Sequence, residues 1–199
     1  VEANRFVMQH GKNILSAKIY RKKQIDELAS DKYIVAMDGE AHYQMRKLQK
    51  RGYARSMLIN HEETLSQVVE QTLSACQPYK PFAAYRFFQQ IMTIQLGRTL
   101  LNHDSAPLWQ HVCRYVDGML MASFAPRYLQ GEHLAAYKAS TVKTLAFADE
   151  MIAAHQKGCP HKDIISALLT AVEQDRSLMN EQELRVAVLT PYIAGINPV

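Results

Sequence analysis

Residues 38–46, DGEAHYQMR, predict a turn followed by the start of a helix. The Asp-Gly pair is typical of turns, and Glu40 suits a first helical turn because its charge complements the helix dipole. His42 and Arg46 are four residues apart, so a helix places them on one face, one turn from each other. Together the two side chains can donate hydrogen bonds to a carboxylate or a phosphate.

A second informative stretch lies near the end of the sequence, where residues 192–198 read YIAGINP. Ala194 and Gly195 are small residues in an apolar helix, where a flat ligand can approach the backbone closely. We predict that this helix begins at a capping box, NEQE at residues 180–183. It is apolar nearly all round over residues 186–196, so we expect it to be central and buried.

Helical periodicity is the main signal elsewhere, because apolar residues recur at every third or fourth position. Eight Gly and seven Pro are few for 199 residues, which also favours helices over a turn-rich β fold. Further helices are predicted over residues 2–9, 15–28, 60–76, 81–100, 108–124, 131–158 and 162–172. Their boundaries depend on Asn60 as a cap, Pro81 at a helix start and Gly158 at a helix end.

One segment, YIVAM at residues 33–37, is a strand candidate without a clear partner. A single short strand cannot form a sheet, so it does not change the fold class. The predicted fold is all-α, a single multi-helix domain over residues 1–199. A chain of this length can bury a sizeable core.

Charge and hydropathy restrict the classes of partner. The net charge of +4 is mild, and no helix-turn-helix pattern or dense basic helix is present, which argues against nucleic acid. The longest apolar stretch, residues 186–196, is too short to span a bilayer, so no membrane partner is expected. Without a secretory signal, the sequence predicts a cytoplasmic protein.

The three cysteines, Cys76, Cys113 and Cys159, are widely spaced. They form no C-x-x-C motif and have no His at zinc-finger spacing, so no metal site is predicted from them. Cys76 lies on the apolar face of a predicted helix and is expected to be a buried thiol. Cys159 lies in a predicted helix–helix connection.

Read together, the two stretches resemble the middle of a cytochrome P-450, from the helix before the substrate loop to the long central helix. Residues 38–46 match the D-G-E-x-H-x-x-x-R pattern of that family, and residues 192–198 correspond to its A-G-x-[D/E]-T segment, with Asn197 and Pro198 in place of its last two residues. The resemblance covers essentially the whole chain but only about half of a complete family member. It implies a cytochrome P-450-like helical domain without the N-terminal β region and the C-terminal haem-ligand loop.

The resemblance implies that His42 and Arg46 bind the propionates of a haem, and that Ala194 and Gly195 pass over the haem where dioxygen binds. The implied function is part of a haem-dependent monooxygenase, an oxidoreductase that inserts one oxygen atom into an organic substrate. Its partners would be a small organic substrate and an electron-transfer protein. The basic run of Lys47, Lys50, Arg51 and Arg55 is typical of a solvated stripe, but in the family this region can face a redox partner.

Three departures from the family pattern bear on activity. None of the three cysteines has the Gly-rich context of the family's iron ligand, so the axial Cys is missing from this chain. Asn197 and Pro198 occupy the positions of the family's acid and alcohol, and neither can relay a proton as that pair does. We therefore predict that this chain alone does not hold haem stably as a thiolate complex and is inactive.

The alternative interpretation is a non-catalytic helical half-domain or proteolytic fragment that self-associates. A His-x-x-x-Arg pair alone is typical of a solvated helix face, and an Ala-Gly pair is typical of close helix packing. In either case we expect a homodimer. We expect the apolar surface of residues 186–196 to be too large for the remaining helices to cover, and exposed apolar patches of that size are uncommon on monomers.

Overall fold

The computed structural model describes residues 2–50, 52–54, 59, 61–158 and 163–197, and it confirms the all-α class, because these residues contain no strand. The α-helices are α1 (Glu2–Ile14), α2 (Ala17–Tyr20), α3 (Lys22–Leu28), α4 (Gly39–Gln49), α6 (Glu62–Ser74), α7 (Ala84–Leu100), α8 (Trp109–Phe124), α9 (Gly131–Gln156), α10 (Ile164–Gln174) and α11 (Glu181–Gly195). Two short 3₁₀ helices, η1 (Ile34–Ala36) and η2 (Pro126–Tyr128), join them.

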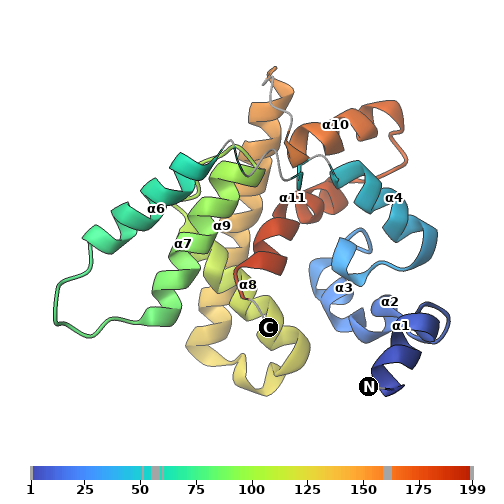
Figure 1. Cartoon of the computed structure of the whole chain (residues 1–199), viewed down its shortest axis with the longest axis horizontal. Helices are drawn as coiled ribbons and strands as arrows, with labels where there is room; N and C mark the ends of the chain where they lie inside the picture. Colours follow the sequence, from blue (N-terminus) through green and yellow to red (C-terminus); the bar gives the residue numbers. More distant parts are fainter. Residues whose placement is uncertain (1, 51, 55–58, 60, 159–162, 198–199) are drawn as a thin grey trace.

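The helices are arranged around α8, α9 and α11 (Figure 1). Helices α8 and α9 pack along each other, α7 packs on α8, and α6 covers the outer side of α7. Helix α11 contacts α7, α8, α9 and α10, whereas α4 packs on α10 and η1. Helix α3 packs on α8, so the N-terminal helices lie on the opposite side of the molecule from α6.

Helix α11 is the centre of the main hydrophobic core, as the sequence predicted. Seven apolar side chains that we expected to need a second copy are each at most 4% exposed: Val186, Ala187, Val188, Leu189, Tyr192, Ile193 and Ile196. The expectation that this surface drives dimer formation is therefore wrong. Helices α7 to α10 of the same chain cover it, so a homodimer, which stays a prediction, would need another surface.

Local capping explains where the predicted boundaries are right. The Asn180 side chain accepts a hydrogen bond from the Glu183 amide at 3.0 Å, and the Glu183 carboxylate accepts one from the Asn180 amide at 2.7 Å. This reciprocal pair is the predicted capping box. Gly131 begins α9 with a φ of +53°, a conformation that glycine adopts without strain.

Two local predictions are wrong. The strand candidate at residues 33–37 is a buried connection whose middle forms η1, because no neighbouring strand offers hydrogen bonds and the amide of Ala36 bonds to the carbonyl of Tyr33 instead. Helix α7 begins at Ala84, three residues after Pro81. Asn60, the predicted cap of α6, lies outside the described residues, and His61 precedes that helix.

Candidate functional site

The turn at Asp38 connects α4 to the helices before it. The Asp38 carboxylate accepts hydrogen bonds from the Ser16 hydroxyl at 2.5 Å and from the amides of Ala17 and Lys18 at 2.8 and 3.1 Å. These bonds hold the pKa of Asp38 below its usual range, the Ser16 hydroxyl contributing most. Asp38 thus caps α2 from a distance in sequence and fixes the point at which α4 begins.

His42 and Arg46 are on α4, one turn apart on the same helix face, as the sequence predicted. His42 is half-buried and Arg46 is exposed, while Met45 and Gln49 form the buried side of the helix. Neither His42 nor Arg46 makes a hydrogen bond or an ion pair with another described residue. They are two spare donors, positioned by α4 but not used by the fold, and could bind one carboxylate together.

Ala194 and Gly195 are the point at which α11 opens to solvent. Every residue from 186 to 193 is buried, whereas Ala194 is exposed and Gly195 is partly exposed. The other side of Gly195 is tight, since a side chain there would start 2.9 Å from the Leu96 methyl group on α7. The small pair therefore combines close packing on α7 with an open backbone face.

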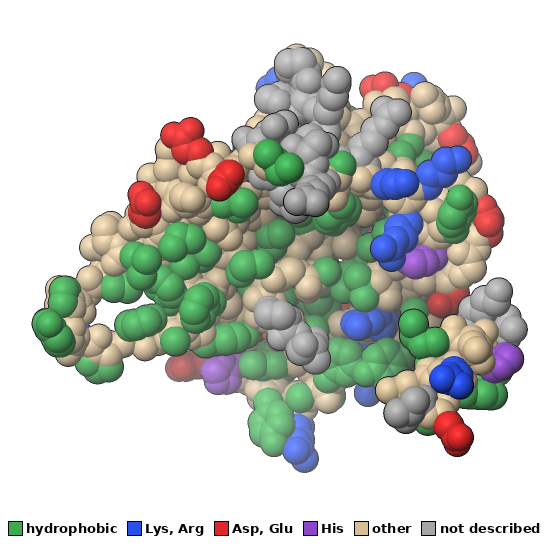
Figure 2. All heavy atoms as spheres, viewed as in Figure 1, with side chains coloured by type: hydrophobic (Ala, Val, Ile, Leu, Met, Phe, Trp, Pro, Cys, Tyr) green, Lys and Arg blue, Asp and Glu red, His purple; other side chains and the backbone are tan. Residues whose placement is uncertain are grey.

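His42 and Arg46 share one face of α4, and Ala194 and Gly195 are neighbours at the end of α11, but no contact among the described residues links the two pairs. Helix α4 packs on α10 and η1, whereas the end of α11 packs on α7 and α8. In Figure 2, several of the visible Lys and Arg side chains lie at the right, over α4, and apolar side chains gather at the left, over α6 and α7. Lys47 and Lys50 are exposed on α4, and Arg51 and Arg55 lie outside the described residues.

Asn197 is held in a polar cluster that the sequence did not reveal. Its amide nitrogen donates to Asp117 on α8 at 2.8 Å, and its oxygen accepts from Tyr85 and Gln89 on α7 at 2.8 and 2.9 Å. Asp117 also accepts from Arg86 at 3.0 Å. Burial, followed by the negative charge of Asp117, raises the pKa of Tyr85.

This cluster gives a structural reason for an asparagine, instead of an acid, at position 197. Asp117 accepts hydrogen bonds from Arg86, Gln89 and Asn197, so an amide at position 197 stabilises it where a second carboxylate would repel it. Asp117 is 80 residues from Asn197 in sequence, and no local pattern connects them. Pro198, the other residue that we singled out here, lies outside the described residues.

The described cysteines do not suit a metal or a thiolate ligand. Cys113 is fully buried, 3.3 Å from the Thr93 hydroxyl, and burial raises the pKa of its thiol to about 11. Cys76 is half-buried and faces the Thr72 carbonyl at 3.8 Å, so the predicted buried thiol is only partly covered. Cys159 lies outside the described residues, and the described part of the chain contains no cluster of three potential metal ligands.

Comparison of the chain with protein-family models and with curated proteins finds no match. Among the helices that the structure describes, none is both long and apolar enough to cross a membrane. The candidate site is therefore defined by its geometry. It consists of the unpaired donors of His42 and Arg46 on α4 and the accessible backbone at Ala194 and Gly195 on α11.

Proposed function

We propose that this chain is part of a haem-dependent monooxygenase, as the resemblance to cytochromes P-450 implies. The observation that supports the proposal best is the exposure pattern of α11. The helix is buried from residue 186 to residue 193 and opens at Ala194 and Gly195, the two residues that the family motif places against the haem. A small pair on an open helix face leaves room for a flat ring system.

The donor set on α4 suits the carboxylates of a haem. His42 and Arg46 have no hydrogen-bond partner among the described residues, and carboxylates favour paired donors of this kind. Neither described cysteine suits the role of iron ligand, because Cys113 is a buried, protonated thiol and Cys76 is half-buried. When bound, haem supplies the oxygen chemistry. This chain contributes the groups that hold and orient it.

The proposal is tested by measuring how much of the binding depends on the haem carboxylates and how much on the ring. Haem and its dimethyl ester, which lacks the two carboxylates, are titrated into the chain and followed by visible absorbance and by quenching of Trp109 fluorescence. We expect weak saturable binding of haem, a lower affinity for the ester, and about ten-fold weaker haem binding by His42→Ala and by Arg46→Ala.

Lys47→Ala is the matched control, because it removes an exposed cation from the same helix. Lys47 follows Arg46 directly in sequence, so its side chain points away from the face that carries His42 and Arg46. It should leave haem affinity within about two-fold of the native value. Ala194→Leu is expected to weaken haem and ester alike, because it fills the open step without removing a donor. Equal affinity for haem and ester, unchanged binding by both α4 variants, or no saturable binding at all would contradict the proposal.

Ligation by a cysteine thiolate is tested by the spectrum of the reduced carbon monoxide complex. We expect no band shifted as thiolate ligation shifts it, and no product when the chain is supplied with electrons and substrate. The reason is that burial keeps Cys113 protonated. A thiolate-type band from this chain would show that one of its cysteines reaches the iron.

The second candidate function is a helical half-domain that self-associates, and a surface other than α11 favours it. Large apolar side chains are exposed where α6 leads into α7: Leu73, Tyr79, Phe82, Tyr85 and Phe88. Figure 2 shows apolar side chains gathered over these helices. Sedimentation should give a species heavier than 22.7 kDa, and the double change Phe82→Ser and Phe88→Ser should restore the monomer.

A further inference from the structure

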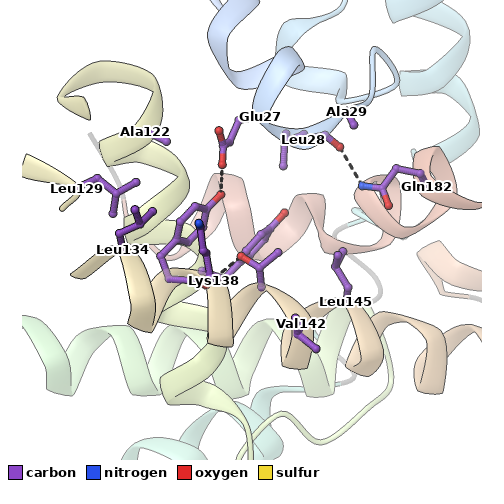
Figure 3. A pocket seen from close by; sticks show the side chains of 13 residues that line it. Glu27, Leu28, Ala29, Ala122, Leu129, Leu134, Lys138, Val142, Leu145 and Gln182 are labelled. Carbon is purple, nitrogen blue, oxygen red and sulfur yellow. Dashed lines mark hydrogen bonds between the residues drawn. The ribbon is translucent and has the colours of Figure 1, made fainter. Parts of the chain in front are cut away.

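A cavity of about 550 Å³ lies between α3, α8, α9 and the start of α11 (Figure 3). None of His42, Arg46, Ala194 and Gly195 lines it. Gln182 lines it from the first turn of α11, which puts Gly195 about 20 Å away along the helix axis. The cavity is therefore a separate site.

The wall of the cavity is mostly apolar. Its aliphatic lining comes from three helices and a connecting segment: Leu28, Ala122, Leu129, Leu134, Val142 and Leu145. Cavities of this volume and character are the usual binding places of small organic molecules. An apolar wall alone, however, would not orient a ligand.

Polar groups at one end of the cavity supply an orientation. Glu27 points from α3 toward α9, where one of its carboxylate oxygens accepts a hydrogen bond from the Tyr137 hydroxyl at 2.5 Å (Figure 3). Its other oxygen accepts no hydrogen bond from a described residue. Tyr137 can pack this close to α8 because position 118 is glycine, where a side chain would start 2.2 Å from the Tyr137 ring.

Tyr115 provides the second polar group, and it is the most informative one. Only 4% of this residue is exposed, it lines the cavity, and its ring stacks on Tyr137 with centroids 6.3 Å apart. Burial, with a further contribution from the charge of Glu27, raises its pKa, so the hydroxyl keeps its proton. That hydroxyl makes no hydrogen bond with another described residue, so it is free to donate one to a molecule in the cavity.

We propose that this cavity binds a neutral, largely apolar molecule that carries a hydroxyl group, such as a polycyclic alcohol or a phenol. The ligand hydroxyl accepts a hydrogen bond from Tyr115 and donates one to the free oxygen of Glu27. Lys138 lies at the same end of the cavity as Glu27, so a charged ligand of either sign would face one like charge. The hydrocarbon part of the ligand covers the aliphatic wall.

The test uses 2-naphthol and 2-methylnaphthalene, two probes of matched shape that differ in the hydroxyl, and measures their binding to the whole chain by equilibrium dialysis. We expect saturable binding of 2-naphthol, and weaker binding of 2-methylnaphthalene. Tyr115→Phe should lower the affinity for 2-naphthol about five- to ten-fold and leave that for 2-methylnaphthalene unchanged. It should not lower the melting temperature, because the hydroxyl that it removes has no partner in the fold.

Two more variants make the result specific to this cavity. Ala122→Trp fills the cavity and should abolish binding of both probes. Tyr43→Phe makes the same chemical change at an exposed tyrosine on α4 and should alter nothing. The proposal is overturned if 2-naphthol does not bind saturably, if Tyr115→Phe binds both probes like the native chain, or if binding survives in a folded Ala122→Trp variant.

Discussion

The outer face of α4 and the end of α11 both carry polar side chains, but they differ in whether the fold uses them. At the end of α11, the donors of Asn197, Gln89 and Arg86 all reach one carboxylate, Asp117. On α4, the donors of His42 and Arg46 reach no described residue. The first arrangement stabilises the fold, and the second leaves donors free for a ligand.

Burial explains this difference. Gln89 is 1% exposed and the Asp117 side chain is 15% exposed, so polar groups there would be costly without partners. Arg46 is exposed, and water satisfies its donors until a ligand replaces it. Polar residues at the end of α11 are therefore structural, whereas His42 and Arg46 on α4 cost the fold little and remain available for binding.

The largest effect is expected from Asp117→Ala. This change removes the shared acceptor and leaves the amide groups of Gln89 and Asn197 without it, so the free energy of unfolding should fall by about 2–4 kcal/mol. Urea unfolding measures it. Asp149→Ala is the control, because it breaks a more exposed ion pair with Arg185 and should cost about 0–1 kcal/mol. Equal losses of unfolding free energy in the two variants would show that Asp117 is no more structural than an exposed ion-pair residue.

Asn197→Asp should have the next largest effect. It places a second carboxylate where the amide donates to Asp117 at 2.8 Å, which raises the pKa of one of the two carboxyl groups in the folded state. A raised folded-state pKa costs stability above the unfolded value of about 4, so we expect a loss of about 1–3 kcal/mol at neutral pH that shrinks as the pH falls.

Chemical unfolding at neutral pH and at about pH 5 measures this trend, since the raised pKa lies above the ordinary value of about 4. Asn180→Asp is the matched control, because aspartate caps a helix about as well as asparagine, and it should stay within about 0.5 kcal/mol of the native chain. A loss that is independent of pH would show that Asn197 acts through packing instead of charge.

A smaller effect is expected from Asp38→Asn, at the start of α4. The hydrogen bonds from Ser16, Ala17 and Lys18 lower the folded-state pKa of Asp38, so its charged form stabilises the fold above the unfolded pKa. That stabilisation is lost as the pH falls through the folded-state value. The melting temperatures of the native chain and the variant should therefore differ at neutral pH and converge below about pH 4. A gap that persists in acid would contradict this assignment.

The smallest effect on stability is expected from the double variant His42→Ala and Arg46→Ala. Because neither side chain makes a hydrogen bond or an ion pair with a described residue, the free energy of unfolding should change by no more than about 0.5 kcal/mol. Urea unfolding measures this change beside the loss of haem affinity predicted above. A loss of more than about 1 kcal/mol would mean that these donors are structural after all.

The sequence predicts what is locally determined. The capping box at Asn180 and Glu183 needs residues only three apart, and the central position of α11 follows from its apolar composition. Periodicity also predicted α8 and α9 to within a few residues. The strand candidate at residues 33–37 failed because β-branched residues indicate a buried extended segment but cannot supply a neighbouring strand.

The sequence does not predict what depends on distant partners. Asp117 meets residues 28 to 80 positions away, and Glu27 meets Tyr137 across 110 residues, so no spacing indicates either contact. The dimer argument from α11 failed for the same reason. Composition showed that its apolar surface had to be covered, but only the structure showed that α7 to α10 of the same chain cover it.

Pro191 divides α11 into two segments with separate supports. Proline has no amide hydrogen, so the carbonyl of Ala187 lacks the bond that would tie the turns on either side together. The Thr190 hydroxyl donates to the carbonyl of Val186, one residue earlier. The first segment is fastened at Asn180 and the second at Asn197. The backbone amides of the two segments should therefore exchange with deuterium as separate units, and the shorter segment, which carries Ala194 and Gly195, should exchange through local opening while the first remains protected.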